Sequence, residues 1–403
     1  MSNGVKNKIA QHLELIKENS VDLISESELV LKLENSFKKN KPLKLKIGFD
    51  PTARDIHLGH TVLLRKLRKL QDLGHQVHLI IGDFTAKIGD PSQRSALRPV
   101  LSDREIKSNA ATYTKQVFKI LNKKKTKIIN NSIWYKKMGL PKFLSLLSSY
   151  TIARILERDD FSQRIKKGKP LTVLEIIYPL IQGYDSYKME ADIEFGGTDQ
   201  KFNLIVGRHL QQTFGQSPQV VVTMPILVGL DGKDKMSKSL NNYIGVTEDS
   251  KSMFGKIMSI SDEIMWEYIR LLSDFNPNEL KEKHPKEVKL NLSESIVSFY
   301  HSKEKAQKER KEFEGVFSKG QLPKEMPIVK VKESVVDIIE ILHNAKMVAS
   351  KNEARRLLSQ GSISLLDSEA KVIAVLKEQS LKISSQGAIF KVGKKRFLKL
   401  ILQ

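Results

Sequence analysis

Two short groups of side chains in this sequence could together hold a polyphosphate. His57 and His60 are separated by Leu-Gly, and a Lys-Met-Ser-Lys-Ser segment occupies residues 235–239. Histidines three residues apart project from one side of a helix's first turn, where free backbone N–H groups already favour negative charge. Lysines on a mobile loop can close over a nucleotide and stabilise the charge that develops on departing pyrophosphate. The two groups predict an ATP site.

Each group also has a plainer explanation. The His-x-x-His spacing occurs in zinc sites, but no third ligand follows nearby, and a lone histidine at such a turn more often caps a helix. A run of lysines in a turn usually lies in solvent. A specified five-residue string is rare by chance, however, and it follows the histidine pair in one chain. We therefore assign Lys235 and Lys238 to the phosphates and favour the nucleotide site over both alternatives.

A sheet is needed to position these groups, and the pattern of the sequence predicts one. Residues 43–49 alternate apolar and polar types as a strand does, residues 57–73 carry apolar side chains at helical spacing, and residues 76–82 form a second strand pattern. This alternation predicts an α/β fold with a Rossmann-type parallel sheet, whose ligand lies at the carboxyl ends of the strands. Residues 113–170 are Lys-rich and helical in pattern, and we interpret them as an insertion.

The sheet pattern resumes after the insertion. Thr172 and Glu175 have the spacing of a capping box and predict the start of another helix. Residues 220–223 predict a further strand before the lysine loop. From 251 to 330 the sequence is helical and strongly charged, and a compact block of helix and short strands follows at 334–403.

Charge and composition narrow the class of protein. Lys and Arg outnumber Asp and Glu by 68 to 46, a formal net charge of +22, which attracts polyanions such as RNA or DNA. The alternative is a lysine-rich proteome with no such partner. The chain has no cysteine, which excludes disulfides and thiol catalysis and fits a reducing compartment. The polar N-terminus and the lack of long apolar runs predict a cytoplasmic protein without membrane association.

The quoted motifs resemble those of a known family. The run Gly-Phe-Asp-Pro-Thr-Ala at 48–53, the histidine pair and the lysine segment are similar to class I aminoacyl-tRNA synthetases, and in particular to the bacterial tyrosyl-tRNA synthetases. The similarity extends from about residue 40 to the C-terminus. It implies attack of the tyrosine carboxylate on the α-phosphate of ATP, followed by transfer of tyrosine to the 3′ end of tRNA(Tyr). Mg²⁺ would arrive with ATP, and no protein-bound metal or organic cofactor is implied.

The resemblance also implies roles for individual residues. Catalysis is assigned to His57, His60, Lys235 and Lys238. ATP contacts are assigned to these four and to Gly48, Asp50, Thr52 and Asp199. Tyrosine contacts are assigned to Thr85, Asp90, Tyr178, Gln182, Asp185 and Gln200.

Phenol recognition involves one helix and one position that differs from many tyrosyl enzymes. Tyr178, Gln182 and Asp185 share one helix face, which could instead be a solvated polar face. By resemblance, Tyr178 and Gln182 hold the α-amino group, and Asp185 accepts a hydrogen bond from the phenol. Many tyrosyl enzymes place a second phenol contact, a tyrosine, where this sequence has Lys46.

The C-terminal block at 334–403 resembles a small RNA-binding module named after a ribosomal small-subunit protein. Ser350 and Glu353 have capping-box spacing at the start of its helix. The residues expected to face RNA phosphates are Arg355, Arg356, Lys391, Lys394, Lys395 and Arg396. By family analogy, 251–330 recognises the anticodon and 113–170 forms the interface of a homodimer.

The expected domain order follows from these assignments. It runs from an N-terminal helical segment (1–40) through a catalytic domain (41–230, with its insertion at about 113–170) and the lysine loop (231–250) to the helical domain (251–330) and the RNA-binding domain (334–403). Three rivals remain: a tryptophanyl enzyme, a non-catalytic RNA-binding scaffold and a small-molecule nucleotidyltransferase. The residues of the tyrosine pocket argue against a tryptophanyl enzyme. The intact His and Lys motifs argue against a non-catalytic scaffold, and the RNA-binding block argues against a small-molecule nucleotidyltransferase.

Overall fold

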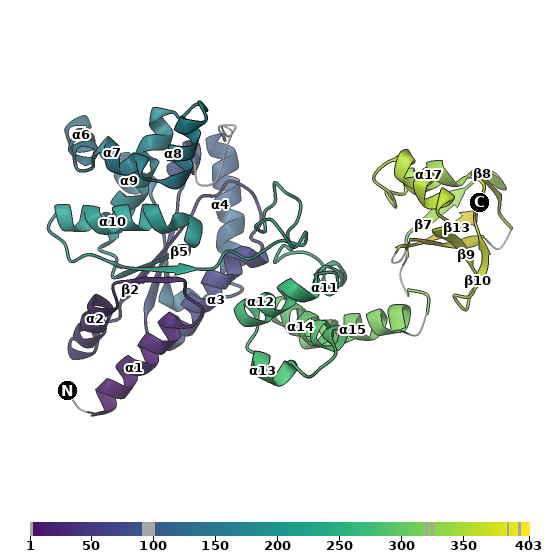
Figure 1. The fold of residues 1–403 in the computed structure, drawn as a ribbon, viewed down its shortest axis with the longest axis horizontal. Helices are drawn as coiled ribbons and strands as arrows, with labels where there is room; N and C mark the ends of the chain where they lie inside the picture. Colours follow the sequence, from purple (N-terminus) through teal and green to yellow (C-terminus); the bar gives the residue numbers. More distant parts are fainter. Residues whose placement is uncertain (1–2, 91–100, 319–320, 324–325, 385–386, 394–395) are drawn as a thin grey trace. The chain divides into compact units, whose positions relative to one another are not determined.

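The computed structural model describes residues 3–90, 101–318, 321–323, 326–384, 387–393 and 396–403. The chain forms two compact units, residues 1–300 and 301–403, which are described separately (Figure 1). The first unit is built on a six-stranded sheet with the order β1-β6-β5-β2-β3-β4. Its strands are β1 (Asp22–Ile24), β2 (Lys44–Phe49), β3 (Gln76–Ile81), β4 (Thr126–Asn130), β5 (Ile193–Gly197) and β6 (Val220–Met224).

Five of these strands run parallel, and β1 pairs antiparallel with β6 at the sheet edge. The inner strands β3 and β6 are buried along almost their whole length and are rich in Val and Ile. Helices on both faces of a parallel sheet require strands of this kind. The predicted α/β fold with a Rossmann-type parallel sheet is confirmed.

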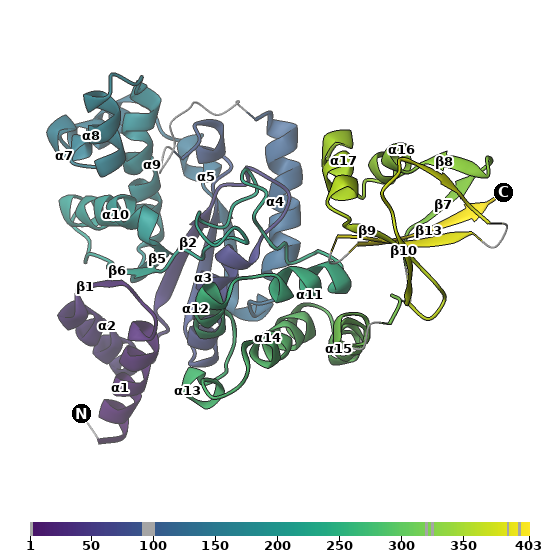
Figure 2. The same cartoon turned by 45° about the vertical axis from the view of Figure 1, so that its right-hand side comes forward.

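The helices divide between the two faces of the sheet. Helices α3 (Leu58–Asp72) and α4 (Asp103–Val117) lie on one face, and α9 (Val173–Met189) and α10 (Lys201–Thr213) lie on the other (Figures 1 and 2). The chain builds β2, β3 and β4 outward in one direction, then returns to place β5 on the other side of β2. The boundary between β2 and β5 is therefore the topological switch point, where ligands bind in open α/β sheets.

Residues 113–170 differ from the helical insertion that we expected. They contain β4, which pairs in parallel with β3 and extends the main sheet. Only the remainder is helical, as α5 (Ser132–Tyr135), α6 (Leu140–Ser148), α7 (Ile152–Leu156) and α8 (Asp159–Lys166). β4 lies at the edge of the sheet and is only partly buried, so its Thr-Lys-Ile-Ile-Asn sequence lacks the long apolar run of the inner strands. Three lysines precede it, which also made the segment look like part of a charged helix.

The ends of the first unit are helical. Helices α1 (Asn3–Lys17) and α2 (Glu26–Lys38) agree with the predicted N-terminal helices, although the three-residue strand β1 between them was missed. Helices α11 (Ser250–Met258), α12 (Asp262–Leu272), α13 (Pro277–Leu280) and α14 (Pro285–Tyr300) complete this unit, and α15 (Lys303–Ser318) begins the second. In the described parts of the chain, no helix combines the length and apolar character needed to cross a bilayer.

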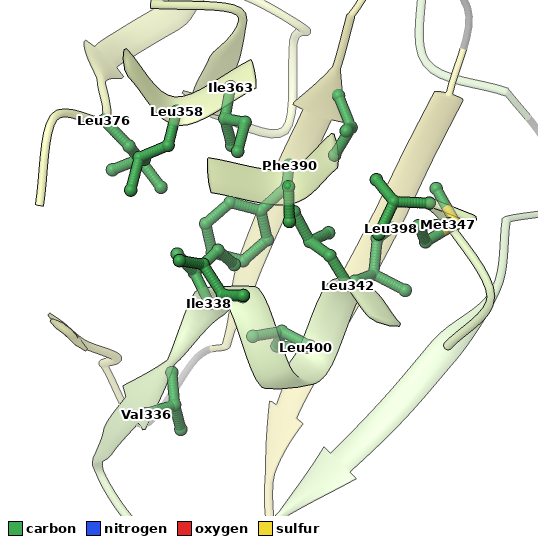
Figure 3. Packing of buried hydrophobic residues seen from close by; sticks show 14 of the residues in the cluster. Val336, Ile338, Leu342, Met347, Leu358, Ile363, Leu376, Phe390, Leu398 and Leu400 are labelled. Atoms are coloured by element: carbon green, nitrogen blue, oxygen red, sulfur yellow. The ribbon is translucent and has the colours of Figure 1, made fainter. Parts of the chain in front are cut away.

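The second unit has an α+β fold around its own apolar core. Its elements are β7 (Ile328–Val331), β8 (Val335–Asp337), α16 (Ile338–Asn344), α17 (Lys351–Ser359), β9 (Ile363–Leu366), β10 (Val372–Val375), β11 (Ser380–Lys382), β12 (Ala388–Val392) and β13 (Arg396–Leu402). They form a five-stranded sheet with the order β10-β9-β12-β13-β7 and a two-stranded β11-β8 sheet. Figure 3 shows Phe390 among Ile338, Leu342 and Leu398, all buried, so this block has a core independent of the first unit.

Candidate active site

A cavity opens in the first unit at the switch point between β2 and β5. The two strands pair at Leu45–Ile193 and Lys46–Glu194. Beyond these pairs, their carboxyl ends line a cavity of about 600 Å³. The cavity is lined by every residue that we expected to contact ATP or tyrosine: Gly48, Asp50, Thr52, His57, His60, Thr85, Asp90, Tyr178, Gln182, Asp185, Asp199, Gln200, Lys235 and Lys238.

Backbone pairing joins the histidine turn to the later part of the lysine loop, at residues 244–246. The Leu58 N–H donates to the Ile244 carbonyl at 2.9 Å, and the Val246 N–H donates to the Ile56 carbonyl at 2.9 Å. Within the loop itself, Met236 is buried and its N–H donates to the Leu227 carbonyl at 2.8 Å. Two sequence motifs about 180 positions apart therefore border one cavity.

The two histidines lie together and are neutral. Their ring centroids are 3.9 Å apart. Burial, with smaller contributions from neighbouring cationic groups, lowers the pKa of His57 well below its ordinary value and that of His60 to about 4. The His57 N–H donates to Nδ1 of His60 at 3.4 Å, which assigns the ring proton of His60 to Nε2. Near neutral pH these imidazoles can donate hydrogen bonds without carrying charge.

Lys235 and Lys238 each contact a residue outside the loop. Lys235 Nζ lies 3.3 Å from Asp199 Oδ2. Lys238 donates to the backbone carbonyl of Asp55, and its Nζ lies 5.7 Å from the centroid of the Tyr113 ring. Burial lowers the pKa of Lys238 to about 8, although Asp55 opposes the shift. Both ammonium groups thus border the cavity.

Asp50 organises one wall of the cavity. Its carboxylate accepts from Thr85 Oγ1 at 2.6 Å and from the Tyr178 hydroxyl at 2.8 Å. A β-carbon on Gly82 would lie 2.0 Å from Asp50 Oδ1 and 2.2 Å from Thr85 Oγ1. Only glycine leaves room for this hydrogen bond. Asp50, expected at the ATP end, therefore also holds two residues expected to contact tyrosine.

Asn203 was missed by the sequence analysis, yet it orients two pocket amides. Its Nδ2 donates to Gln182 Oε1 at 2.9 Å and to Gln200 Oε1 at 3.1 Å. Gln200 in turn donates to Asp90 Oδ2 at 2.7 Å. Four residues from α9, α10 and the adjoining loops are thereby fixed relative to one another.

Asp185 lines the pocket and is buried. Its carboxylate accepts from Trp134 Nε1 at 2.8 Å, from the Tyr135 hydroxyl at 2.9 Å and from Asn131 Nδ2 at 3.2 Å. Burial raises the pKa of Asp185 to about 6, and the nearby Lys46 and these hydrogen bonds oppose the rise. The three donors directly follow β4. They were missed because that strand was not recognised.

Lys46 makes a buried network beneath the pocket. Its Nζ donates to Glu194 Oε1 at 2.7 Å, to Ser186 Oγ at 2.6 Å and to the Gln182 carbonyl at 3.2 Å. Because an ammonium group has three hydrogens, these acceptors use all of them. Lys46 therefore holds α9 against the sheet and offers no spare donor to a ligand.

Comparison with known proteins agrees with this geometry. The family model for class I tRNA synthetases (W and Y) matches residues 38–318, and the model for a tyrosine–tRNA ligase SYY-like C-terminal domain matches residues 319–400. The chain belongs to the class I tRNA synthetases. The resemblance seen in the sequence is confirmed, and the chain is an aminoacyl-tRNA synthetase.

Relatives of this synthetase span almost its whole length. The tyrosine–tRNA ligases of Desulfotalea psychrophila and Aquifex aeolicus are each 48% identical to it, over 98% and 97% of this chain and 98% of each relative. The structure of the Archaeoglobus fulgidus tyrosyl-tRNA synthetase complexed with L-tyrosine is 25% identical. It covers 75% of this chain and 99% of its own, with a TM-score of 0.61.

The second unit of the synthetase presents part of the predicted RNA-binding set. Arg355 and Arg356 are exposed on α17, and Arg355 donates to Asn352 Oδ1 at 2.9 Å. Lys391 lies with its Nζ 6.0 Å from the centroid of the Phe397 ring. Lys394 and Lys395 fall outside the described residues.

Arg396 and Glu353 show a different arrangement from the expected one. Arg396 pairs with Glu353 Oε1 at 3.1 Å and donates to the Met347 carbonyl, so its guanidinium is engaged within the unit. Ser350 caps α17 by accepting from the Glu353 N–H at 3.2 Å. The Glu353 carboxylate accepts instead from the Ala349 N–H at 2.7 Å, so the predicted return half of the capping box is wrong.

Proposed function

We propose that this synthetase activates L-tyrosine in the cavity between β2 and β5 and then charges tRNA(Tyr). One observation carries the proposal: a single cavity combines the histidine turn and lysine loop of the family with a buried carboxylate, Asp185. In the first step a tyrosine carboxylate oxygen attacks the α-phosphorus of ATP, and the bond to the bridging oxygen breaks. The products are tyrosyl-adenylate and pyrophosphate. In the second step a ribose hydroxyl at the tRNA 3′ end attacks the acyl carbon, and AMP leaves.

The nucleotide end of the cavity suits charge stabilisation. His57 and His60, being neutral, would donate N–H groups to the triphosphate, and Lys235 and Lys238 would balance charge developing on pyrophosphate. Lys235 would have to exchange its contact with Asp199 for phosphate, which would free Asp199 for the adenylate ribose. Gly48 and Thr52 complete the ATP end. Mg²⁺ would enter bound to ATP. The chemistry of class I synthetases consists mainly of positioning and charge stabilisation.

The amino-acid end suits tyrosine. Tyr178 and Gln182 would hold the α-amino group, with Asp90 and Thr85 beside them, and Gln200 would orient the tyrosyl group. Asp185 would accept a hydrogen bond from the phenol. Phenylalanine would leave this buried carboxylate without that partner, which costs free energy and favours tyrosine.

Recognition of tRNA would involve both units. Exposed Arg355 and Arg356 on α17 would contact RNA phosphates, and such contacts add salt-sensitive affinity but little sequence reading. The helices within 251–330 would read the anticodon. A role in tRNA charging favours the cytoplasm as the place of action.

The same synthetase would act as a homodimer through the helices that follow β4, from α5 to the start of α9. Large apolar side chains are exposed there on successive elements: Ile133, Leu140, Leu144, Ile152, Ile165, Val173 and Leu174. Exposed apolar side chains gathered in one region mark protein interaction sites. Sedimentation velocity of Leu140→Asp/Ile152→Asp should show monomers, whereas Leu31→Asp, at an exposed position on α2, should remain dimeric.

Amino-acid-dependent ATP–pyrophosphate exchange, measured without tRNA for all twenty amino acids, tests the first step. Exchange with tyrosine alone is expected. Exchange with tryptophan would overturn the pocket assignment, and no exchange with any amino acid would favour a non-catalytic RNA-binding protein. Charging of tRNA(Tyr) with labelled tyrosine then tests the second step.

A further inference from the structure

The first part of the lysine loop, residues 231–242, is mostly exposed, but two of its side chains are buried. Between residues 231 and 242 these are Met236 and Asn242. Met236 is apolar and packs toward Gly59 in the histidine turn, where its Cβ lies 3.7 Å from the ideal Cβ position of that glycine. Asn242 is 4% exposed and polar, so its burial calls for partners.

The Asn242 side chain finds those partners on both sides of Met236. Its Oδ1 accepts from the Ser237 N–H at 2.7 Å, and its Nδ2 donates to the Lys235 carbonyl at 3.1 Å. The same amide donates to Asp231 Oδ2. One side chain therefore fixes the backbone of the residue before Met236 and of the residue after it.

The surrounding turn is shaped around this amide. The Asn242 carbonyl accepts from the Leu230 N–H at 2.8 Å, and Asp231 Oδ1 accepts from the backbone N–H groups of Lys233 and Asp234, both at 2.9 Å. A β-carbon on Gly229 would lie 2.2 Å from Asn242 Nδ2 and 2.4 Å from its Cγ. Gly229 is the neighbour that leaves space for the amide.

We infer that Asn242 is a positioning residue for the lysine loop: its side-chain amide holds the 235–237 backbone so that Lys235 and Lys238 point into the cavity. The inference rests on the proposed function, in which both lysines act on the pyrophosphate of ATP. Asn242 itself contacts neither substrate. Because lysines act only after ATP binds, loss of the amide should slow adenylate formation and leave tyrosine binding unchanged.

The decisive variant is Asn242→Asp, which keeps the size of the side chain and removes its N–H donors. An ionised carboxylate there would face Asp231 and the Lys235 carbonyl, and two adjacent carboxylates disfavour ionisation. We expect kcat for tyrosine-dependent pyrophosphate exchange to fall roughly 100-fold at pH 8, as displacement of catalytic groups by about 1 Å commonly does. The KM for tyrosine should change less than about twofold. The ratio of variant to wild-type kcat should recover as the pH is lowered toward 6, since protonation restores a donor.

The neighbouring residue provides a matched control. Asn241 is exposed, and its backbone lies at φ 52°, a region that Asn and Asp both adopt. Asn241→Asp adds the same charge to the same loop and should leave kcat within about twofold of wild type. Gly229→Ala, which adds no charge, should reproduce the kcat defect without the recovery at lower pH.

Equilibrium dialysis of tyrosine without ATP verifies that each variant is folded. Three results would overturn the inference: Asn242→Asp activity within twofold of wild type, equal losses in Asn241→Asp and Asn242→Asp, or a KM for tyrosine that rises as kcat falls. A wild-type protein without any tyrosine-dependent exchange would instead contradict the proposed function. The two failures are therefore distinguishable.

Discussion

Lys46 and Glu194 are directly paired residues on the adjacent strands β2 and β5, and their side chains form a buried ion pair with Nζ and Oε1 2.7 Å apart. Only 1% and 2% of the two side chains are exposed. Glu194 Oε2 also accepts from Ser186 at 2.7 Å and from Gln219, so each charged group is fully surrounded by partners. This pair lies where the sheet opens into the substrate cavity.

Removing one member of that pair should destabilise the first unit. Lys46→Met would leave a buried carboxylate without its cation, and we expect the free energy of unfolding to fall by roughly 3–5 kcal/mol. Lys46→Met combined with Glu194→Gln should regain most of that loss. Urea unfolding followed by tryptophan fluorescence measures this, since Trp134 and Trp266 both lie in the first unit. As a control, Lys44→Met removes the more exposed Lys44–Glu190 pair of the same strand and should cost less than about 1 kcal/mol.

Discrimination between tyrosine and phenylalanine should depend on the ionised form of Asp185. Its pKa is about 6, so the carboxylate is protonated as the pH falls through that value and becomes a weaker acceptor for the phenol. We expect kcat/KM for tyrosine to fall below pH 6, whereas that for phenylalanine, which lacks the hydroxyl, stays level by comparison. Asp185→Asn should lower kcat/KM for tyrosine about 10–100-fold relative to phenylalanine.

Trp134→Phe separates this effect from general damage to the pocket. The indole hydrogen bond lowers the pKa of Asp185, so its removal should shift the fall in tyrosine kcat/KM to higher pH. If kcat/KM for tyrosine and for phenylalanine changed with pH in the same way, Asp185 would not be the residue that contacts the phenol.

Lys238 should act on the transition state of adenylate formation. Lys238→Ala should reduce kcat for exchange by about 10²–10³-fold and leave tyrosine affinity nearly unchanged. The pKa of about 8 means that the wild-type ammonium loses its proton as the pH rises above 8, so kcat/KM for ATP should decline there. Lys238→Arg keeps its charge and should not show that decline. If tyrosine affinity and kcat fell together in Lys238→Ala, the role would be structural.

Charge reversal on α17 should impair tRNA charging alone. Arg355→Glu/Arg356→Glu should raise the KM for tRNA at least about tenfold and flatten its salt dependence, because phosphate contacts release counterions. Pyrophosphate exchange should be unchanged. Lys377→Glu/Lys382→Glu, exposed in the same unit but off this helix, is the matched control. An equal effect of both double variants would show that net charge, and not the α17 surface, governs tRNA binding.

Sequence reasoning found the cavity-lining residues that share one helix or one short segment. Tyr178, Gln182 and Asp185 project from one helix, and the two signature motifs are short strings, so both could be recognised without a structure. It failed where partners are brought together by the sheet. The pairing of Lys46 with Glu194 depends on β2 and β5 being neighbours, and the donors to Asp185 depend on recognising β4 as a strand.

Asn242 illustrates a second kind of failure. Its position next to an exposed asparagine gives no local signal of burial. Only the folded loop reveals that its amide reaches back to Lys235 and Asp231. A side chain that hydrogen-bonds several backbone groups of its own loop is set by the path of the backbone, and composition and periodicity do not reveal that path.

The close approach at Gly82 limits how this pocket can evolve or be redesigned. A side chain at position 82 would occupy the space of the Asp50–Thr85 hydrogen bond, so the three positions form one linked choice. Variant libraries that change only Asp50 or only Thr85 keep Gly82, although the hydrogen bond that required a glycine there is lost. Libraries that change only Gly82 displace both Asp50 and Thr85. An altered amino-acid specificity at this wall therefore has to be sought by changing all three positions together.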